Sequence, residues 1–123
     1  MGTAYAGYQV QENANTVQAE VEKALQIYFK RNISLTGSSR TDTGVHALQN
    51  FFHFDCEHRV PREKIYNLNA LLPPDIAIRS IVEVATDAHC RFDARSREYK
   101  YFIYNKKNPF LSGRAYYFPY TIN

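Results

Sequence analysis

The sequence predicts an α+β fold, a two-layer ferredoxin-like sandwich with helices on one face of a mainly antiparallel sheet. Two observations support this prediction. Segments with helical spacing of apolar residues and segments with strand-like alternation follow one another as helix, strand, strand, helix, strand, strand, and the first residues could add a strand before them. The connections are also too short for the helical crossovers of a doubly wound sheet. We therefore expect residues 1–123 to form a single domain.

The first helix is expected to begin near Val17. Asn15 could cap its N-terminus, with Gln18 three positions later in capping-box register. Asn32 follows two basic residues, which suit the C-terminal end of a helix, and is expected to close it. The apolar residues of this segment recur at helical spacing, and they are Val17, Val21, Ala24, Leu25 and Tyr28.

Two strands are expected on either side of a polar turn. Residues 33–36 form the first strand and lead into the turn, and residues 48–55 form the second. Alternate side chains of a strand point to opposite faces, so Phe52 and Phe54 share one face of the second strand. Phe51 and His53 share the other face.

A second helix is expected from Pro61, because proline is favoured at the first helical position. Two prolines at positions 73 and 74 stop this helix. Its apolar stripe consists of Ile65, Leu68 and Leu72. Alternating apolar residues then predict strands within residues 76–84 and over residues 97–105.

The composition narrows the class of protein without identifying it. Lys and Arg number 15 against 12 Asp and Glu, and this net charge of +3 is too small by itself to indicate nucleic acid. The 10 tyrosines could include residues that stack on bases, although most are expected in the core and on the sheet. Cys56 and Cys90 are not in metal-ligand spacing, so we expect no metal site and a reduced, cytoplasmic protein. Neither a membrane span nor a signal peptide is expected.

Residues 37–47 hold the most reactive combination of side chains in the sequence, an arginine and a carboxylate in a turn bounded by glycines. An aspartate is normally ionised at neutral pH, and Arg40 would hold Asp42 in that state if the turn brings the two together. Asp42 would then suit the role of nucleophile or electrostatic stabiliser better than that of general acid. For a generic turn of this composition, the default is an Asx-turn in which Asp42 bonds to backbone amides.

The rest of the chain carries a resemblance that outweighs this default. The turn resembles the R-T-D-x-G-V-H-A string of the TruA family of tRNA pseudouridine synthases. Further blocks resemble that family in the same order along the chain, and they are residues 2–9, 11–13, 16–18, 53–55, 67–73, 88–94 and 97–101. The resemblance covers essentially the whole chain.

The resemblance implies an enzyme that isomerises uridine to pseudouridine in the anticodon stem-loop of tRNA, without cofactor or metal. It implies that Asp42 is the catalytic nucleophile, attacking either the ribose or the uracil ring. The uridine must leave the base stack first, and Arg40 is implied to fill the gap or to hold the flipped nucleotide. Tyr99 is implied to stack on the flipped uracil, whereas from the strand pattern alone it could be a core aromatic.

Other residues are expected to contact the RNA substrate. Arg97 and Lys100, with Arg91 and Arg95 nearby, could meet phosphates, or they could be a solvated strand edge. His46 is interpreted as a substrate-binding or scaffold residue, because a metal site would need further ligands. The resemblance also implies a homodimer of the full-length protein, with tRNA spanning both subunits.

The resemblance further implies that residues 1–123 are the N-terminal, aspartate-bearing half of a longer enzyme. A C-terminal half that completes the cleft is expected outside this sequence, so the fragment alone could be inactive. A non-catalytic RNA-binding module is the main alternative. The triplet Asp42-Thr43-Gly44 also matches aspartic proteases, but Arg40 would favour the doubly ionised state that such proteases must avoid.

Overall fold

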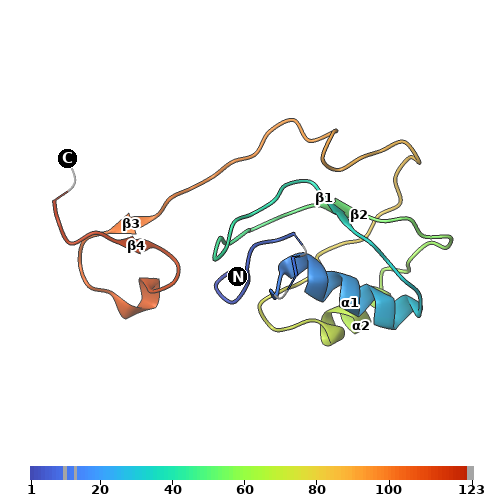
Figure 1. The fold of residues 1–123 in the computed structure, drawn as a ribbon, viewed down its shortest axis with the longest axis horizontal. Coiled ribbons are helices and arrows are strands. Elements are labelled where there is room, and N and C mark those ends of the chain that lie inside the picture. The colour runs from blue at the N-terminus through green and yellow to red at the C-terminus, as the bar shows by residue number, and fades with distance from the viewer. Residues whose placement is uncertain (10, 13, 122–123) are drawn as a thin grey trace.

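The computed structural model describes residues 1–9, 11–12 and 14–121 and shows a mixed α+β fold (Figure 1). Its elements in chain order are α1 (Val17–Phe29), β1 (Thr36–Gly37), β2 (Phe52–His53), α2 (Lys64–Leu71), β3 (Ile103–Tyr104), the short 3-10 helix η1 (Pro109–Leu111) and β4 (Tyr116–Tyr117). Within the described ranges, no helix has the length and apolar character needed to cross a lipid bilayer. The presence of both helices and strands confirms the predicted α+β class.

Helix α1 is capped by Thr16 and not by Asn15 as predicted. The Thr16 side chain is buried, and its hydroxyl oxygen accepts a hydrogen bond from the backbone N–H of Ala19 at 3.3 Å. This bond satisfies one of the N–H groups that a helix start leaves without a partner. At the other end Lys30 adopts a φ of 55°, the left-handed conformation that commonly ends helices, so the helix closes two residues before the predicted Asn32.

Helix α2 begins at Lys64, three residues later than the predicted start at Pro61. The Pro61 carbonyl accepts a hydrogen bond from the Lys64 N–H at 3.0 Å, so the proline lies in the turn that leads into the helix. The predicted apolar stripe is confirmed, because Leu68 is fully buried and Leu72 is buried just beyond the end of the helix.

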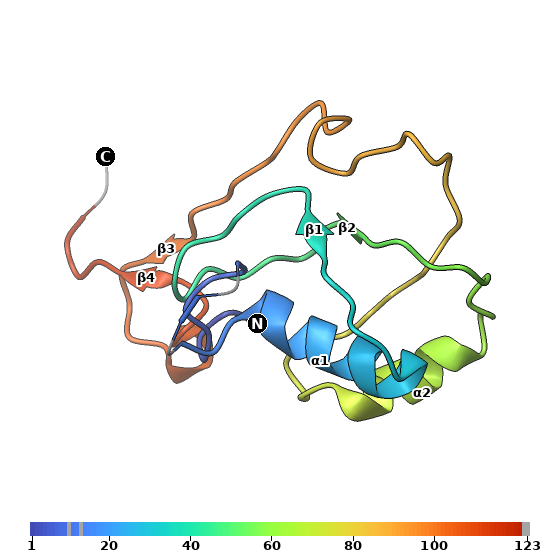
Figure 2. The same ribbon diagram turned by 45° about the vertical axis from the view of Figure 1, so that its right-hand side comes forward.

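The core lies where α1 and α2 pack side by side near the β1–β2 pair (Figure 2). Phe52 and Phe54 both pack against this core, in agreement with the prediction that they share one face of the strand. Full burial of one large aliphatic side chain contributes about 1.5–3 kcal/mol to stability, so this cluster is the main source of cohesion in the body of the molecule. The buried members are Val21, Ala24, Leu25, Ile33, Leu35, Leu68, Leu72 and Ile78.

The sheets are smaller than predicted. Strand β1 pairs with β2 in antiparallel fashion, and β3 pairs with β4 in parallel fashion. The described residues do not form the continuous sheet of a complete ferredoxin-like sandwich: residues 76–84 contain no strand, and within residues 97–105 only Ile103–Tyr104 pair. An extended segment becomes a strand only through hydrogen bonds with a neighbouring strand, and these segments leave large side chains in solvent, with Tyr101 89% exposed.

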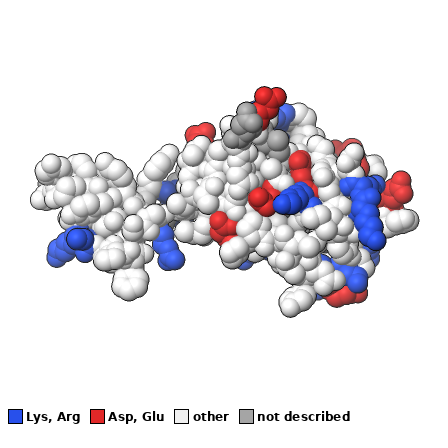
Figure 3. All heavy atoms as spheres, turned by 60° about the horizontal axis from the view of Figure 1, so that its bottom comes forward, with Lys and Arg blue, Asp and Glu red and all other residues white. Residues whose placement is uncertain are grey.

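The C-terminal part of the chain lies apart from the helices. Residues 85–93 form turns and are held to the body by the bonds of Cys90 to His53 and Thr36. Residues 94–98 then run without helix or strand toward residues 99–121, here called the arm, which contain the β3–β4 pair (Figures 1 and 2). The arm contains four basic residues and no acidic one. Figure 3 shows this contrast on one face, since basic and acidic side chains mix over the body while the charged side chains visible on the arm are basic. The arm is therefore a positively charged extension of the body.

Candidate active site

The turn between β1 and β2 is held in place by the N-terminal segment. The backbone N–H of Tyr8 donates to the Thr41 carbonyl at 3.2 Å, and the N–H of Gly44 donates to the Tyr5 carbonyl at 3.2 Å. Within the turn, the N–H of Val45 donates to the carbonyl of Asp42 at 3.2 Å. These three bonds fix the backbone on both sides of Asp42, so the position of its Cα is determined by tertiary contacts.

Two glycines allow the N-terminal segment to approach the turn closely. Gly7 has a φ of +80°, and a Cβ built on it would lie 2.4 Å from the Thr41 carbonyl oxygen. A Cβ on Gly2 would lie 1.8 Å from the Val45 carbonyl oxygen. Real Cβ atoms do not come this close to backbone oxygens, so both positions require glycine for the backbones to touch.

The carboxylate of Asp42 is exposed. Within the described part of the chain, it makes no hydrogen bond and no ion pair, and Arg40 is exposed and likewise unpaired. The structure therefore shows neither the Arg40–Asp42 ion pair nor the Asx-turn that the sequence leaves open. Asp42 presents a free carboxylate on a fixed backbone.

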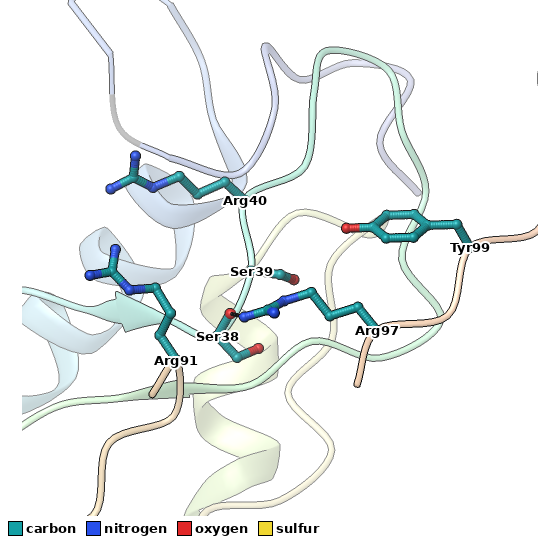
Figure 4. A pocket seen from close by; sticks show the side chains of 6 residues that line it. All are labelled: Ser38, Ser39, Arg40, Arg91, Arg97 and Tyr99. Atoms are coloured by element: carbon teal, nitrogen blue, oxygen red, sulfur yellow. Dashed lines mark hydrogen bonds between the residues drawn. The ribbon is translucent and has the colours of Figure 1, made fainter. Parts of the chain in front are cut away.

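A hollow of about 330 Å³ lies beside the turn (Figure 4). Its six lining residues are Ser38, Ser39, Arg40, Arg91, Arg97 and Tyr99. Figure 4 shows Arg40 and Arg91 extending to the same side, while Arg97 and Tyr99 reach in from the extended segment that follows residue 91. Three guanidinium groups without a carboxylate among the lining residues favour an anionic ligand such as a phosphate.

Hydrogen bonds hold one side of this hollow in place. A guanidinium nitrogen of Arg97 donates to the Ser38 carbonyl at 2.5 Å. Ser38 is buried, its N–H donates to the Phe51 carbonyl at 2.8 Å, and its hydroxyl donates to the Asn50 side-chain oxygen at 2.8 Å. Arg97 is thus anchored to the end of β1, whereas the guanidinium groups of Arg40 and Arg91 make no hydrogen bond or ion pair within the described ranges.

The structure brings together some of the predicted site residues and separates others. Arg40, Arg97 and Tyr99 line the hollow, but Asp42, Lys100 and His46 do not. Lys100 forms an exposed ion pair with Glu98 at 2.8 Å, which leaves it on the solvent side of the segment.

His46 follows Asp42 in the turn, whereas the turn residues that line the hollow, Ser38, Ser39 and Arg40, precede it. Its Nδ1 accepts a hydrogen bond from the Gly2 N–H at 2.8 Å, and its Nε2 contacts the Gly113 carbonyl.

Two polar residues of the site carry no distinctive signal in the sequence. Ser38 and Asn50 are ordinary polar residues near a turn, and their role depends on the pairing of β1 with β2. The N-terminal segment does carry a signal, because Gly2 and Gly7 lie on either side of Tyr5 within six residues. Closely spaced glycines of this kind indicate a place where backbones meet.

The cysteine next to the hollow is not a candidate nucleophile. Burial raises the pKa of the Cys90 thiol above its usual range, and the thiol donates a hydrogen bond to the Thr36 carbonyl at 3.0 Å. Since the thiolate is the reactive form, a raised pKa keeps this group inert near neutral pH. Among the described residues, no cluster of three or more His, Cys, Asp or Glu side chains could hold a metal ion.

Comparison with known proteins assigns the family. A family model described as tRNA pseudouridine synthase matches residues 1–93. The tRNA pseudouridine synthase A of Staphylococcus aureus strain Newman is 42% identical over 125 residues, a match that covers 99% of this chain and 47% of the relative. The enzymes of strains JH1 and N315 match equally well. The chain spans about half the length of the curated relatives it matches, and it belongs to the TruA family of tRNA pseudouridine synthases.

Proposed function

We propose that the complete protein containing this chain isomerises uridine to pseudouridine in the anticodon stem-loop of tRNA, with Asp42 as the nucleophile. One observation carries the assignment of the nucleophile. The Asp42 carboxylate is exposed and has no partner among the described residues, while hydrogen bonds from both sides fix its backbone. A nucleophile needs a free reactive atom in a fixed position, and this combination provides it.

The reaction neither adds nor removes atoms and involves no net oxidation, so its balance requires no co-reactant. The bond from the ribose C1′ to the uracil N1 breaks, the base rotates, and a bond from C1′ to C5 forms while the hydrogen on C5 leaves as a proton and N1 gains one. The Asp42 carboxylate would assist the cleavage by attacking either the ribose or the ring. Both routes need the same fixed, ionised carboxylate.

Arg40 and Tyr99 suit the handling of a nucleotide outside the stack. Extruding a base costs a few kcal/mol, which contacts in the site must offset. The Tyr99 ring is 60% exposed at the hollow and can stack on a base, and the Arg40 guanidinium is free to bond to the flipped nucleotide or its phosphate. Arg91 and Arg97 lie in the same hollow and would meet the adjacent backbone phosphates.

The arm supports RNA as the partner. It has four basic residues and no acidic one, and its exposed aromatic side chains include Tyr101, Phe110 and Tyr120. Basic residues interleaved with aromatic rings suit a nucleic acid, because the former meet phosphates and the latter stack on bases. We therefore place the tRNA across the hollow and the arm.

Replacement of Asp42 by Asn tests the assignment. In the full-length gene product, Asp42→Asn should lower pseudouridine formation at least a thousandfold, because an amide is not a nucleophile, while tRNA binding changes little. Release of tritium from tRNA labelled at C5 of uridine measures turnover, and filter binding measures affinity. Asp87→Asn is a matched control, since Asp87 is an exposed carboxylate in a loop. Undiminished turnover by the Asp42 variant would refute its role.

The same assay separates the alternatives. A full-length protein that binds tRNA and releases no tritium would be an RNA-binding module. Peptidase activity inhibited by pepstatin would instead point to an aspartic protease. Running residues 1–123 beside the full-length protein shows whether this aspartate-bearing domain acts alone.

Three further properties belong to this proposal. We place the complete protein in the cytoplasm, where tRNA is located. We also propose a homodimer, tested by light scattering with and without tRNA. In the complete protein, residues 76–84 and 97–105 would join the sheet of a ferredoxin-like sandwich. Slow amide hydrogen exchange in both segments of the complete protein, compared with residues 1–123, would support this arrangement.

A further inference from the structure

His46 connects three segments that are far apart in the sequence. Its ring lies four residues beyond Asp42 in the same turn. Its Nδ1 accepts a hydrogen bond from the Gly2 N–H at 2.8 Å, at the start of the chain, and its Nε2 bonds to the carbonyl of Gly113 in the arm. Among the described residues, the bond to Gly113 is the one hydrogen bond between the arm and residues 1–97. The imidazole is therefore the point where the turn, the N-terminus and the arm meet.

The two partners determine the tautomer of the ring. A neutral imidazole has one N–H donor and one acceptor nitrogen. The backbone N–H of Gly2 can only donate, so Nδ1 must carry the lone pair. The carbonyl of Gly113 can only accept, so Nε2 must carry the hydrogen. Both nitrogens of His46 are thus occupied by backbone groups, and neither is free to bond to RNA.

The bond to Gly2 reinforces the contacts that hold Asp42. Gly2 also approaches the Val45 carbonyl too closely for any other residue, so the N-terminus and the turn touch at two adjacent points. Val45 in turn donates to the Asp42 carbonyl. Loss of the His46–Gly2 bond would loosen this chain of contacts and let the nucleophile move.

We propose that His46 is a positioning residue that holds the Asp42 turn and the arm in register, and that it does not bind the RNA. This inference rests on the proposed function for its kinetic consequence. A displacement of about 1 Å in a reacting group can lower turnover about a hundredfold. A residue that contacts RNA would instead change the affinity for tRNA.

Kinetics of the full-length gene product distinguish the two roles. His46→Ala should lower kcat about a hundredfold, while KM for tRNA rises by a much smaller factor because the loosened arm keeps its own basic and aromatic side chains. His46→Asn should recover at least about tenfold of this loss, because its amide oxygen can replace Nδ1 as acceptor for the Gly2 N–H. His58→Ala is the control, since His58 is exposed and its ring makes no hydrogen bond in the described part of the chain. A higher KM at unchanged kcat, or no kinetic change, would overturn the proposal.

Nuclear magnetic resonance of residues 1–123 tests the same role without turnover. The ¹⁵N shifts of the His46 ring should show the tautomer protonated at Nε2, and a ring protonated at Nδ1 would overturn the proposal. In His46→Ala, hydrogen exchange at the Gly44 and Val45 amides should accelerate at least tenfold while the Ser38 amide, bonded to Phe51, keeps its rate. Unchanged exchange at both turn amides would also overturn it. A full-length protein that makes no pseudouridine would refute the proposed function and leave these two measurements to decide on His46.

Discussion

The close approach of Gly7 to the turn that carries Asp42 leads to a quantitative prediction about stability. Replacement of Gly7 by Ala would place a methyl group 2.4 Å from the Thr41 carbonyl oxygen, at a residue whose φ is +80°. Two other glycines separate these effects. Gly44 and Gly113 have φ values of +78° and +73°, but a Cβ on either would have no atom within 4 Å.

The controls experience backbone strain without a collision. An L-residue in the left-handed region costs about 1–2 kcal/mol, and reduced freedom of the unfolded chain offsets about 0.4–1 kcal/mol of this cost. Gly44→Ala and Gly113→Ala should therefore lose up to about 1.5 kcal/mol. Gly7→Ala must also displace the Thr41 carbonyl, which accepts the Tyr8 N–H at 3.2 Å. The lost bond costs about 1 kcal/mol and overpacking about 1–3 kcal/mol. The Gly7→Ala protein should therefore lose about 2–4 kcal/mol more free energy of unfolding than the two control variants.

Urea unfolding of residues 1–123 measures this difference. With a denaturant dependence of about 1–3 kcal/mol per molar urea, the midpoint of Gly7→Ala should lie roughly 0.7–4 M below those of the controls at an unchanged slope. A difference below about 0.5 kcal/mol between Gly7→Ala and Gly44→Ala would refute the close approach. The N-terminal segment would then not fix the turn through this contact.

Five other substitutions and one titration test the packing of the N-terminal segment and α1 by the same unfolding assay. Thr16→Ala should lower the free energy of unfolding by about 1 kcal/mol, because it removes the cap of α1. Thr16→Ser should keep most of this stability, since serine can also cap a helix. A comparable loss in Asn15→Ala would contradict the assignment of Thr16 as the cap. Tyr8→Phe should raise the free energy of unfolding by about 1 kcal/mol, because the buried Tyr8 hydroxyl has no hydrogen-bond partner in the described structure. Tyr5→Phe should lower it by about 1–3 kcal/mol, because it removes the 2.5 Å bond to Asp75. Equal effects of the two substitutions would contradict both assignments. Burial raises the pKa of both phenols, so they stay protonated when folded and ionise more readily when unfolded. The stability contributed by the two protonated phenols should be complete below about pH 10 and be lost as the pH rises further. Tyr8→Phe should make this loss of stability at alkaline pH less steep. An unchanged slope in the variant would contradict a buried, protonated Tyr8.

The helices could be predicted from the sequence better than the sheet. The apolar spacing of the two helical segments is a local property, and the buried residues Leu25 and Leu68 lie where it predicts. The ends were predicted less well, because capping depends on which neighbouring side chain reaches the free N–H groups. Thr16 and Asn15 are both good caps by type, and only the path of the chain into α1 selects Thr16.

The strands could be predicted less well than the helices, because a strand depends on a distant partner. Alternation identifies the apolar face of Phe52 and Phe54, which packs against the core. The same alternation occurs in residues 97–105, where most side chains remain exposed. A strand exists only when a second strand pairs with it, and the pattern of one segment does not contain the position of its neighbour.

The sequence by itself determined the family, since the string around Asp42 and the ordered blocks that accompany it are a property of residue order. It also identified Arg40, Arg97 and Tyr99 as candidates, but it could not determine that they line one hollow from two distant segments, with Arg91 beside them. Only the tertiary structure showed that Asp42 is free of Arg40 and that His46 bonds to backbone at both ring nitrogens. The physical reason is that a few ångströms decide whether two charges pair or a ring nitrogen is occupied, and those distances depend on how the N-terminus, the turn and the arm pack together.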